Sequence, residues 1–235
     1  MIYITGDTHG ELKYFSPDRM PFGSDEKVIV TGDFGFVFAQ DQEEQRELDI
    51  LGSRPYEILF IPGNHENYPA LAEFPLVERY GAPVRKIREN IYMLLRGEIY
   101  TIEGKTFFAF GGAYSIDKDW RMQYEKVYGV PIWFQEELPS SEEYRRGIAN
   151  LQACGMKVDY VLTHTAPRCV IPQIIQKAPD LHEDELNGFL NWLYHDGTFK
   201  AWYCGHFHMD LRVNDQMFAC FEGIYPLGTG PVHGN

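Results

Sequence analysis

The sequence predicts an α/β fold with two packed β-sheets covered by helices. In the first part of the chain, short apolar runs that stop at Gly or Pro alternate with stretches rich in helix-forming residues. Runs of this kind are typical of buried strands. Further along, several strand-like runs follow each other closely. Alternation followed by a run of strands favours a layered α/β domain, and 235 residues suit a single one.

The expected elements follow in chain order. Apolar runs predict buried strands at residues 2–4, 28–30 and 58–61. Between and after them, helices are expected at residues 40–51 and 68–80, the second interrupted by Pro75. Meandering strands are then predicted at residues 91–95, 99–102 and 107–110. Residues 142–151 place Tyr144, Ile148 and Leu151 on one helix face.

The last third continues the pattern. A strand is expected at residues 158–162, and a helix is expected where Leu186, Phe189, Leu190 and Leu193 form an apolar stripe. Strands are predicted at residues 200–204, 211–213 and 217–221. There is no internal repeat and no low-complexity linker, so we treat residues 1–235 as a single domain.

Charge and composition limit the classes of function. The formal net charge of −13 argues against a protein that coats DNA or RNA, although bound cations would reverse the charge locally in a nuclease. The four cysteines form no CxxC pair, and we interpret them as reduced, mostly buried thiols of a cytoplasmic protein. No targeting segment is visible, and no apolar run approaches the roughly 20 residues that span a membrane.

Side chains that can bind metals follow five of the predicted strands. These residues are Asp7, His9, Asp33, Asn64, His164, His206 and His208. In α/β sheets, ligands bind outside the carboxyl ends of the strands, where a rigid backbone fixes the geometry. A mixed set of oxygen and nitrogen ligands suits Mn, Fe, Zn or Ni better than Ca or Mg. The sequence therefore predicts a transition-metal site.

The motifs resemble those of the calcineurin-like metallophosphoesterase superfamily, and they occur in that family's order. They read Asp7-Thr8-His9, Gly32-Asp33, Gly63-Asn64-His65-Glu66, an isolated His164 and Gly205-His206-Phe207-His208. One such motif would be weak support, but five in order over residues 7–208 are specific. The resemblance implies a four-layer α/β/β/α sandwich with two mixed sheets flanked by helices.

The resemblance also implies roles for these residues. Asp7, His9 and His208 would hold one divalent metal, Asn64, His164 and His206 the other, and Asp33 would bridge the pair. We favour Mn among the four metals. A hydroxide bridging the metals would attack phosphorus in line, hydrolysing a phosphomonoester or phosphodiester of a small phosphorylated substrate or nucleotide. His65 would be the catalytic residue that stabilises developing charge or protonates the leaving oxygen.

One motif departs from the Ser/Thr phosphatase branch. That branch continues its second motif with an Asp that pairs with the catalytic His and an Arg that grips phosphate. Here Phe36 and Val37 stand at those positions. This counts against a protein phosphatase and against the dinucleoside tetraphosphatases that share the Arg, and it means that another group must orient His65.

Residues 111–121 are the expected replacement for the missing phosphate clamp. Arg121 and Lys118 are candidates to bind phosphate, and Tyr114 is a candidate to stack on a base or ring. We interpret residues 113–150 as a cap or insertion that shapes substrate choice. The Glu43-Glu44 and Glu136-Glu137 pairs are interpreted as solvated faces, and His182, His195 and His233 as surface histidines.

Two alternatives stay open. The first is a nuclease acting on DNA or RNA, which the acidic charge disfavours. The second is a non-catalytic scaffold of the same fold, which the complete ligand set disfavours.

Overall fold

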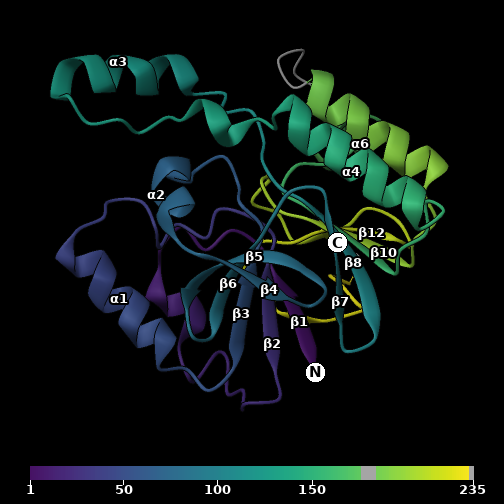
Figure 1. The fold of residues 1–235 in the computed structure, drawn as a ribbon, viewed down its shortest axis with the longest axis horizontal. Helices are drawn as coiled ribbons and strands as arrows, with labels where there is room; N and C mark the ends of the chain where they lie inside the picture. Colours follow the sequence, from purple (N-terminus) through teal and green to yellow (C-terminus); the bar gives the residue numbers. More distant parts are fainter. Residues whose placement is uncertain (176–183, 233–235) are drawn as a thin grey trace.

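Two β-sheets lie face to face between two layers of helices (Figure 1). The computed structural model describes residues 1–175 and 184–232. The predicted four-layer α/β/β/α sandwich is confirmed. Both sheets are mixed, because parallel central strands are flanked by antiparallel ones.

The first sheet has seven strands, and its central four run parallel. In sheet order the strands are β13 (Tyr225–Pro226), β1 (Ile2–Thr5), β2 (Lys27–Val30), β3 (Glu57–Phe60), β6 (Ile91–Leu94), β5 (Ala82–Arg88) and β4 (Leu76–Arg79). The second sheet has six strands: β11 (Leu211–Arg212), β12 (Met217–Ala219), β10 (Ala201–Cys204), β9 (Tyr160–Thr163), β8 (Lys105–Phe110) and β7 (Glu98–Ile102).

Alternation along the strands divides the apolar residues into three clusters. Ile4 of β1 faces the second sheet and packs in one cluster with Phe107 and Leu162. Val28 and Val30 face the opposite way, because neighbouring side chains of a strand point to opposite faces. They pack under α1 (Gln42–Gly52) and α2 (Tyr68–Glu73).

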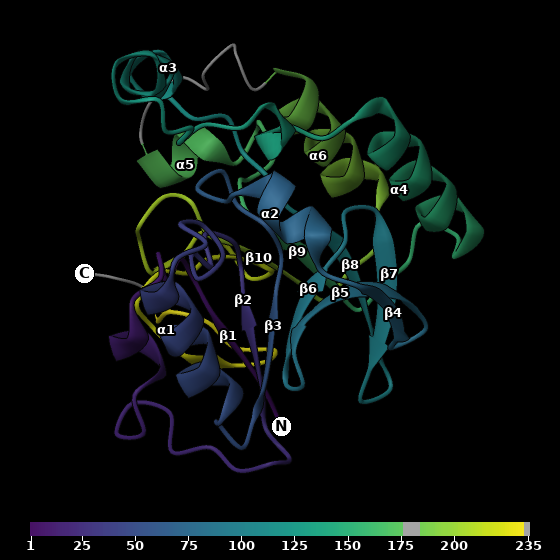
Figure 2. The ribbon, with the colours of Figure 1, turned by 60° about the vertical axis from the view of Figure 1, so that its left-hand side comes forward.

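The third cluster lies on the outer face of the second sheet. It contains Trp202 of β10 together with Leu151 of α4 (Ser141–Ala153) and Leu190 of α6 (Asp184–Asp196). Figure 2 shows α4 and α6 on the opposite side of the sheets from α1. The shorter helices are η1 (Leu12–Phe15), η2 (Gln135–Glu137) and α5 (Ile171–Ile175).

The helix predicted at residues 68–80 is wrong in its second half. The α2 helix ends at Glu73, two residues before Pro75, which cannot donate a backbone hydrogen bond. The strand β4 follows and pairs with β5 through a two-residue turn. Tyr80 and Gly81 both have positive φ, 59° and 83°, as a type I′ hairpin turn requires.

Residues 116–136, which include the helix α3 (Lys118–Tyr128), form an arm that extends away from the two sheets (Figure 1). The helix ends at Tyr128, and Gly129 after it has a φ of 70°, the left-handed conformation common after helices. Its apolar side chains Trp120 and Val127 are exposed. The proposed cap at residues 113–150 thus contains this arm, η2 and most of α4.

Two further observations bear on the predictions. All four cysteines are free, but only Cys204 and Cys220 are buried, whereas Cys154 and Cys169 are exposed. The prediction of mostly buried thiols is therefore wrong for half of them. Within residues 1–175 and 184–232, no helix combines the length and the apolar character needed to cross a membrane.

Candidate active site

The structure brings all seven predicted ligand residues to one place, at the carboxyl ends of five strands. Asp7 and His9 follow β1, Asp33 follows β2, Asn64 follows β3, His164 follows β9, and His206 and His208 follow β10. These strands are parallel within each sheet, so their carboxyl ends meet along one edge of the sandwich.

The backbone at this edge is strained in an unusual way. Four of the seven residues have positive φ: His9 (47°), Asp33 (47°), His206 (70°) and His208 (50°). Residues other than glycine rarely adopt this region, at a cost of about 1–3 kcal/mol each, and such residues cluster at functional sites. All four residues lie in the loops that follow β1, β2 and β10.

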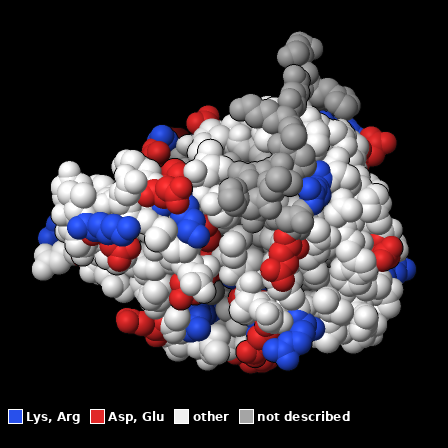
Figure 3. Space-filling model, turned by 90° about the horizontal axis from the view of Figure 1, so that it is seen from above, with Lys and Arg blue, Asp and Glu red and all other residues white. Residues whose placement is uncertain are grey.

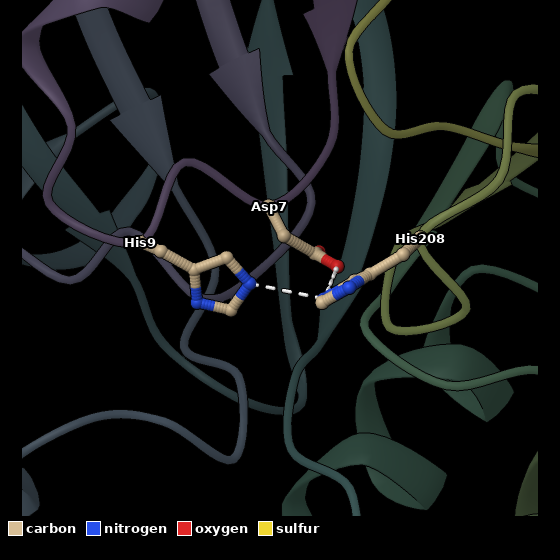
Figure 4. A group of neighbouring side chains, drawn as sticks. All are labelled: Asp7, His9 and His208. Atoms are coloured by element: carbon tan, nitrogen blue, oxygen red, sulfur yellow. Dashed lines mark hydrogen bonds and ion pairs between the residues drawn. The ribbon is translucent and has the colours of Figure 1, made fainter.

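The first group of ligand atoms comprises Asp7, His9 and His208 (Figure 4). Nε2 of His9 lies 3.0 Å from Nε2 of His208, and that atom lies 3.3 Å from Oδ2 of Asp7. Phe221 stacks on the His208 ring at a centroid distance of 4.7 Å and fixes its plane. Two imidazoles and one carboxylate thus bring potential ligand atoms within 4.8 Å of one another.

The second group is centred on His164, which is fully buried. Its Nδ1 lies 2.9 Å from the carbonyl oxygen of Thr31 and 3.6 Å from Oδ1 of Asp7. Its Nε2 lies 3.4 Å from Oδ1 of Asp33 and 3.0 Å from Oδ1 of Asn64. Nδ1 of His206 lies 3.1 Å from the same Asn64 oxygen.

Backbone N–H groups hold the two carboxylates in place. The His206 N–H donates to both oxygens of Asp7, at 3.1 and 3.0 Å. The His65 N–H donates to Oδ1 of Asp33 at 2.8 Å. Gly205 is required beside Asp7, since a Cβ there would lie 2.3 Å from the Asp7 carboxylate oxygen.

The electrostatics of the site favour a positive charge between the carboxylates. Burial raises the pKa of Asp7 to about 7, and the nearby Asp33 carboxylate adds to the rise. Burial alone would lower the pKa of His164, yet Asp33 and Asp7 raise it to about 9. Burial lowers the pKa of His206 to about 3, which keeps that imidazole neutral and able to coordinate a metal.

The donor set fits divalent transition metals. It offers carboxylate oxygens, one amide oxygen and imidazole nitrogens, the mixture that Mn, Fe, Zn and Ni accept. Buried carboxylates are expensive unless a cation or hydrogen bonds compensate them.

Comparison with known proteins agrees with this geometry. The family model described as calcineurin-like phosphoesterase matches residues 1–210. The chain belongs to that family. The predicted resemblance is confirmed, and phosphoester hydrolysis is the activity that the family supports.

The other comparisons with this chain are more distant. No functionally curated protein matches it. A Staphylococcus aureus protein, described as a candidate 5′-nucleotidase in complex with α-ketoglutarate, is one similar solved structure, with 14% identity and a TM-score of 0.47. The alignment covers 95% of this chain and 49% of that one, so this chain spans about half the length of its neighbour.

His65 lies beside the ligands, and the arm supplies its partner. Nη2 of Arg121 contacts Nδ1 of His65 and lies 3.2 Å from its Nε2. Arg121 is itself held by Asp117, which accepts from its Nε at 2.8 Å, and by the Ile132 carbonyl oxygen at 3.0 Å. Arg121 therefore meets the need for a group that orients His65.

Phe36 and Val37 take no part in the candidate site. Both are buried in the cluster under α1 and α2, where Phe36 packs against Phe15 and Phe34. The structure explains the departure from the phosphatase motif, since the two positions have become core positions and the arm brings in an arginine from another direction.

Of the other two predicted substrate residues, Lys118 lies on the arm and Tyr114 lies just before it in the sequence. The Lys118 ammonium is 4.2 Å from the centre of the Trp133 ring and 6.0 Å from that of Tyr114. Tyr114 is half-buried. These residues form a cation–aromatic group next to Arg121 in the sequence.

The solvated-face interpretation of the glutamate pairs is wrong for one member of each pair. Glu137 is fully buried and accepts hydrogen bonds from Ser115, whereas Glu136 is exposed. Glu44 is buried and accepts from the backbone N–H of residues 38–40, while Glu43 is exposed.

Sequence reasoning missed Ser115, Glu137 and Arg96, because nothing in their local pattern marks them. Of the three histidines outside the motifs, His195 is exposed as predicted, and His182 and His233 lie outside the described residues.

Proposed function

We propose that this chain hydrolyses a phosphomonoester or phosphodiester of a small phosphorylated substrate or nucleotide, using two divalent transition metals, with Mn favoured. One observation carries the proposal. The seven ligand side chains form one continuous set of contacts, in which neighbouring polar atoms lie 3.0–3.9 Å apart. A cytoplasmic location and a single domain over residues 1–235 are part of the same proposal.

Two ion positions account for the contacts. Asp7, His9 and His208 would hold one ion, and Asn64, His164 and His206 the other. Asp33 is the natural bridge, because its Oδ2 lies 3.9 Å from Nδ1 of His9 while its Oδ1 lies 3.4 Å from Nε2 of His164. Bound ions would activate water as the nucleophile and neutralise phosphate charge.

His65 and Arg121 would act on the substrate directly. Arginine can only donate hydrogen bonds, so the ring nitrogen of His65 that accepts from Arg121 carries no hydrogen, and the other ring nitrogen can be the protonated one. That N–H can stabilise or protonate the leaving oxygen. The Arg121 fork, held by Asp117, can also bind phosphate oxygens. Lys118 and Tyr114 are proposed to contact the rest of the substrate.

The nuclease alternative has one supporting observation. Trp120, Tyr124 and Tyr128 form an aromatic row along α3, with ring centroids 5.7 and 4.5 Å apart, on which bases could stack. On the face seen from above, however, the described Lys and Arg residues are interspersed with Asp and Glu rather than forming a continuous basic surface (Figure 3). We therefore favour a small substrate.

The test combines metal analysis with turnover. We expect the purified protein to bind transition metal and to hydrolyse an aryl phosphate or an aryl phosphodiester with Mn²⁺. Asp33→Asn should abolish turnover, because it removes the bridging carboxylate. Asp215→Asn, which changes a carboxylate that is 95% exposed, serves as the matched control. No bound transition metal and no turnover with Mn²⁺ would refute the enzyme proposal and favour the scaffold alternative.

A further inference from the structure

A chain of three hydrogen bonds joins the ligand Asn64 to the base of the arm. Nδ2 of Asn64 donates to Oγ of Ser115 at 3.0 Å. Oγ of Ser115 donates to Oε2 of Glu137 at 2.6 Å, and the Ser115 N–H donates to Oε1 of Glu137 at 3.0 Å. We call Ser115 and Glu137 the clasp, because they lie at the two roots of the arm.

The polarity of this chain decides which end of the Asn64 amide faces the ligand cluster. A carboxylate only accepts, so the single hydroxyl hydrogen of Ser115 is committed to Glu137. Oγ of Ser115 can then offer only a lone pair to Asn64. A flipped amide would place its oxygen against that lone pair. The amide nitrogen must therefore face Ser115, and the oxygen must face His164 and His206, as it does.

The surroundings leave no easy substitute for these bonds. Ser115, Glu137 and Asn64 are 1%, 0% and 5% exposed, so solvent cannot readily replace a lost partner. Glu137 is fixed from behind by Arg96, whose Nη2 donates to the carbonyl oxygens of Glu136 and Glu137 at 2.8 and 3.0 Å. The clasp is therefore rigid and internally satisfied.

We propose that Ser115 and Glu137 are positioning residues that fix the amide of Asn64 with its oxygen toward a metal. The proposal rests on the proposed function, which makes Asn64 a metal ligand. Groups behind a ligand typically change metal affinity by about 10–100-fold when they are removed. The clasp also closes the loop that carries Arg121 to His65, so the same two side chains organise the ligand and the base of the arm.

Calorimetric titration with Mn²⁺ tests this. Glu137→Gln keeps the shape but gives Ser115 a competing donor, which frees its hydroxyl to face a flipped Asn64 amide. We expect the wild type to bind two Mn²⁺ ions and Glu137→Gln to bind one of them at least about tenfold more weakly. Ser115→Ala should do the same. Glu136→Gln removes the neighbouring exposed charge and should match the wild type.

A second readout does not need metal. The side-chain amide hydrogens of Asn64, followed by NMR, should be protected from exchange in the wild type and in Glu136→Gln, and should lose protection in Glu137→Gln and Ser115→Ala. Thermal melting confirms that each variant is folded. If the wild type binds no Mn²⁺, the proposed function fails, but amide exchange still decides the role of the clasp. Unchanged Mn²⁺ affinity and unchanged amide protection in both clasp variants would overturn the inference.

Discussion

Replacing Arg96 with Met should destabilise the protein substantially. The side chain is 3% exposed and lies where the arm meets the core. Its Nε donates to the Gly111 carbonyl oxygen at 2.8 Å, and its Nη2 donates to those of Glu136 and Glu137. It also contacts the Tyr68 hydroxyl and packs over that ring. Met fills much of the same volume but donates nothing.

The size of the effect follows from the acceptors left behind. Three carbonyl oxygens would lose their charged donor, at about 1 kcal/mol or more each for buried groups without a partner. The Glu143 carboxylate would not be stranded, since it is 26% exposed and accepts from the Ser140 N–H at 2.7 Å. We therefore expect a loss of about 3 kcal/mol, the lower end for a disrupted buried ion pair.

Thermal unfolding and urea titration would measure this loss. In a chain of this size, about 3 kcal/mol corresponds to a fall in Tm of about 6–12 °C. Arg145→Met is the matched control, because Arg145 is exposed on α4, and it should change stability by less than about 0.5 kcal/mol. A fall in Tm below about 2 °C for Arg96→Met would show that these hydrogen bonds do not hold the arm to the core.

Three other predictions concern the site. Gly205→Ala would place a Cβ 2.3 Å from Oδ1 of Asp7 and should therefore lower Mn²⁺ affinity at least about tenfold. Gly188→Ala is the control and should leave the affinity unchanged, because its Cβ would meet nothing within 4 Å. Equal Mn²⁺ affinities of the two variants would contradict the packing argument. Arg121→Ala should lower kcat/KM by about 100-fold, with partial recovery in Arg121→Lys; normal kinetics would remove Arg121 from the reaction. Mn²⁺ at about 100 times its Kd should add about 2.7 kcal/mol to the unfolding free energy per site, and EDTA should reverse this; a Tm indifferent to both would argue against a metal centre.

Much of the fold could be predicted because its strands are buried on both faces. Residues 28–30 and 58–61 read as continuous apolar runs, as parallel strands covered on both sides do. The hairpin of β4 and β5 was missed because its strands are not continuous apolar runs. In β4 exposed residues alternate with half-buried ones, in β5 buried residues are interspersed with half-buried ones such as Lys86, and no Asn-Gly or Asp-Gly marks the Tyr80-Gly81 turn.

The proposed ligand residues could be picked out from the sequence because each follows a strand within a few residues. The groups behind them could not. Glu137 stands beside another glutamate and before a helix, which is typical of a solvated surface. Its burial depends on Ser115, 22 residues away, and on Arg96, 41 residues away. Contacts of this range leave no periodic trace in one sequence. Arg121 was predicted as a phosphate-binding residue from its position after a strand. Its contact with His65 depends on the path of α3 and could not be predicted from the sequence.

The left-handed backbone at His9, Asp33, His206 and His208 sets activity and stability against each other. The fold carries this strain at all times, whereas the benefit under the proposed function would arise only when substrate turns over. Glycine at His9 or His208 would relax the loop by about 1 kcal/mol and would remove a proposed metal ligand in the same step. If catalysis were no longer selected, glycine at these positions would therefore raise the stability of the fold while abolishing the proposed activity. The four strained residues are easiest to understand in a protein whose site is still in use.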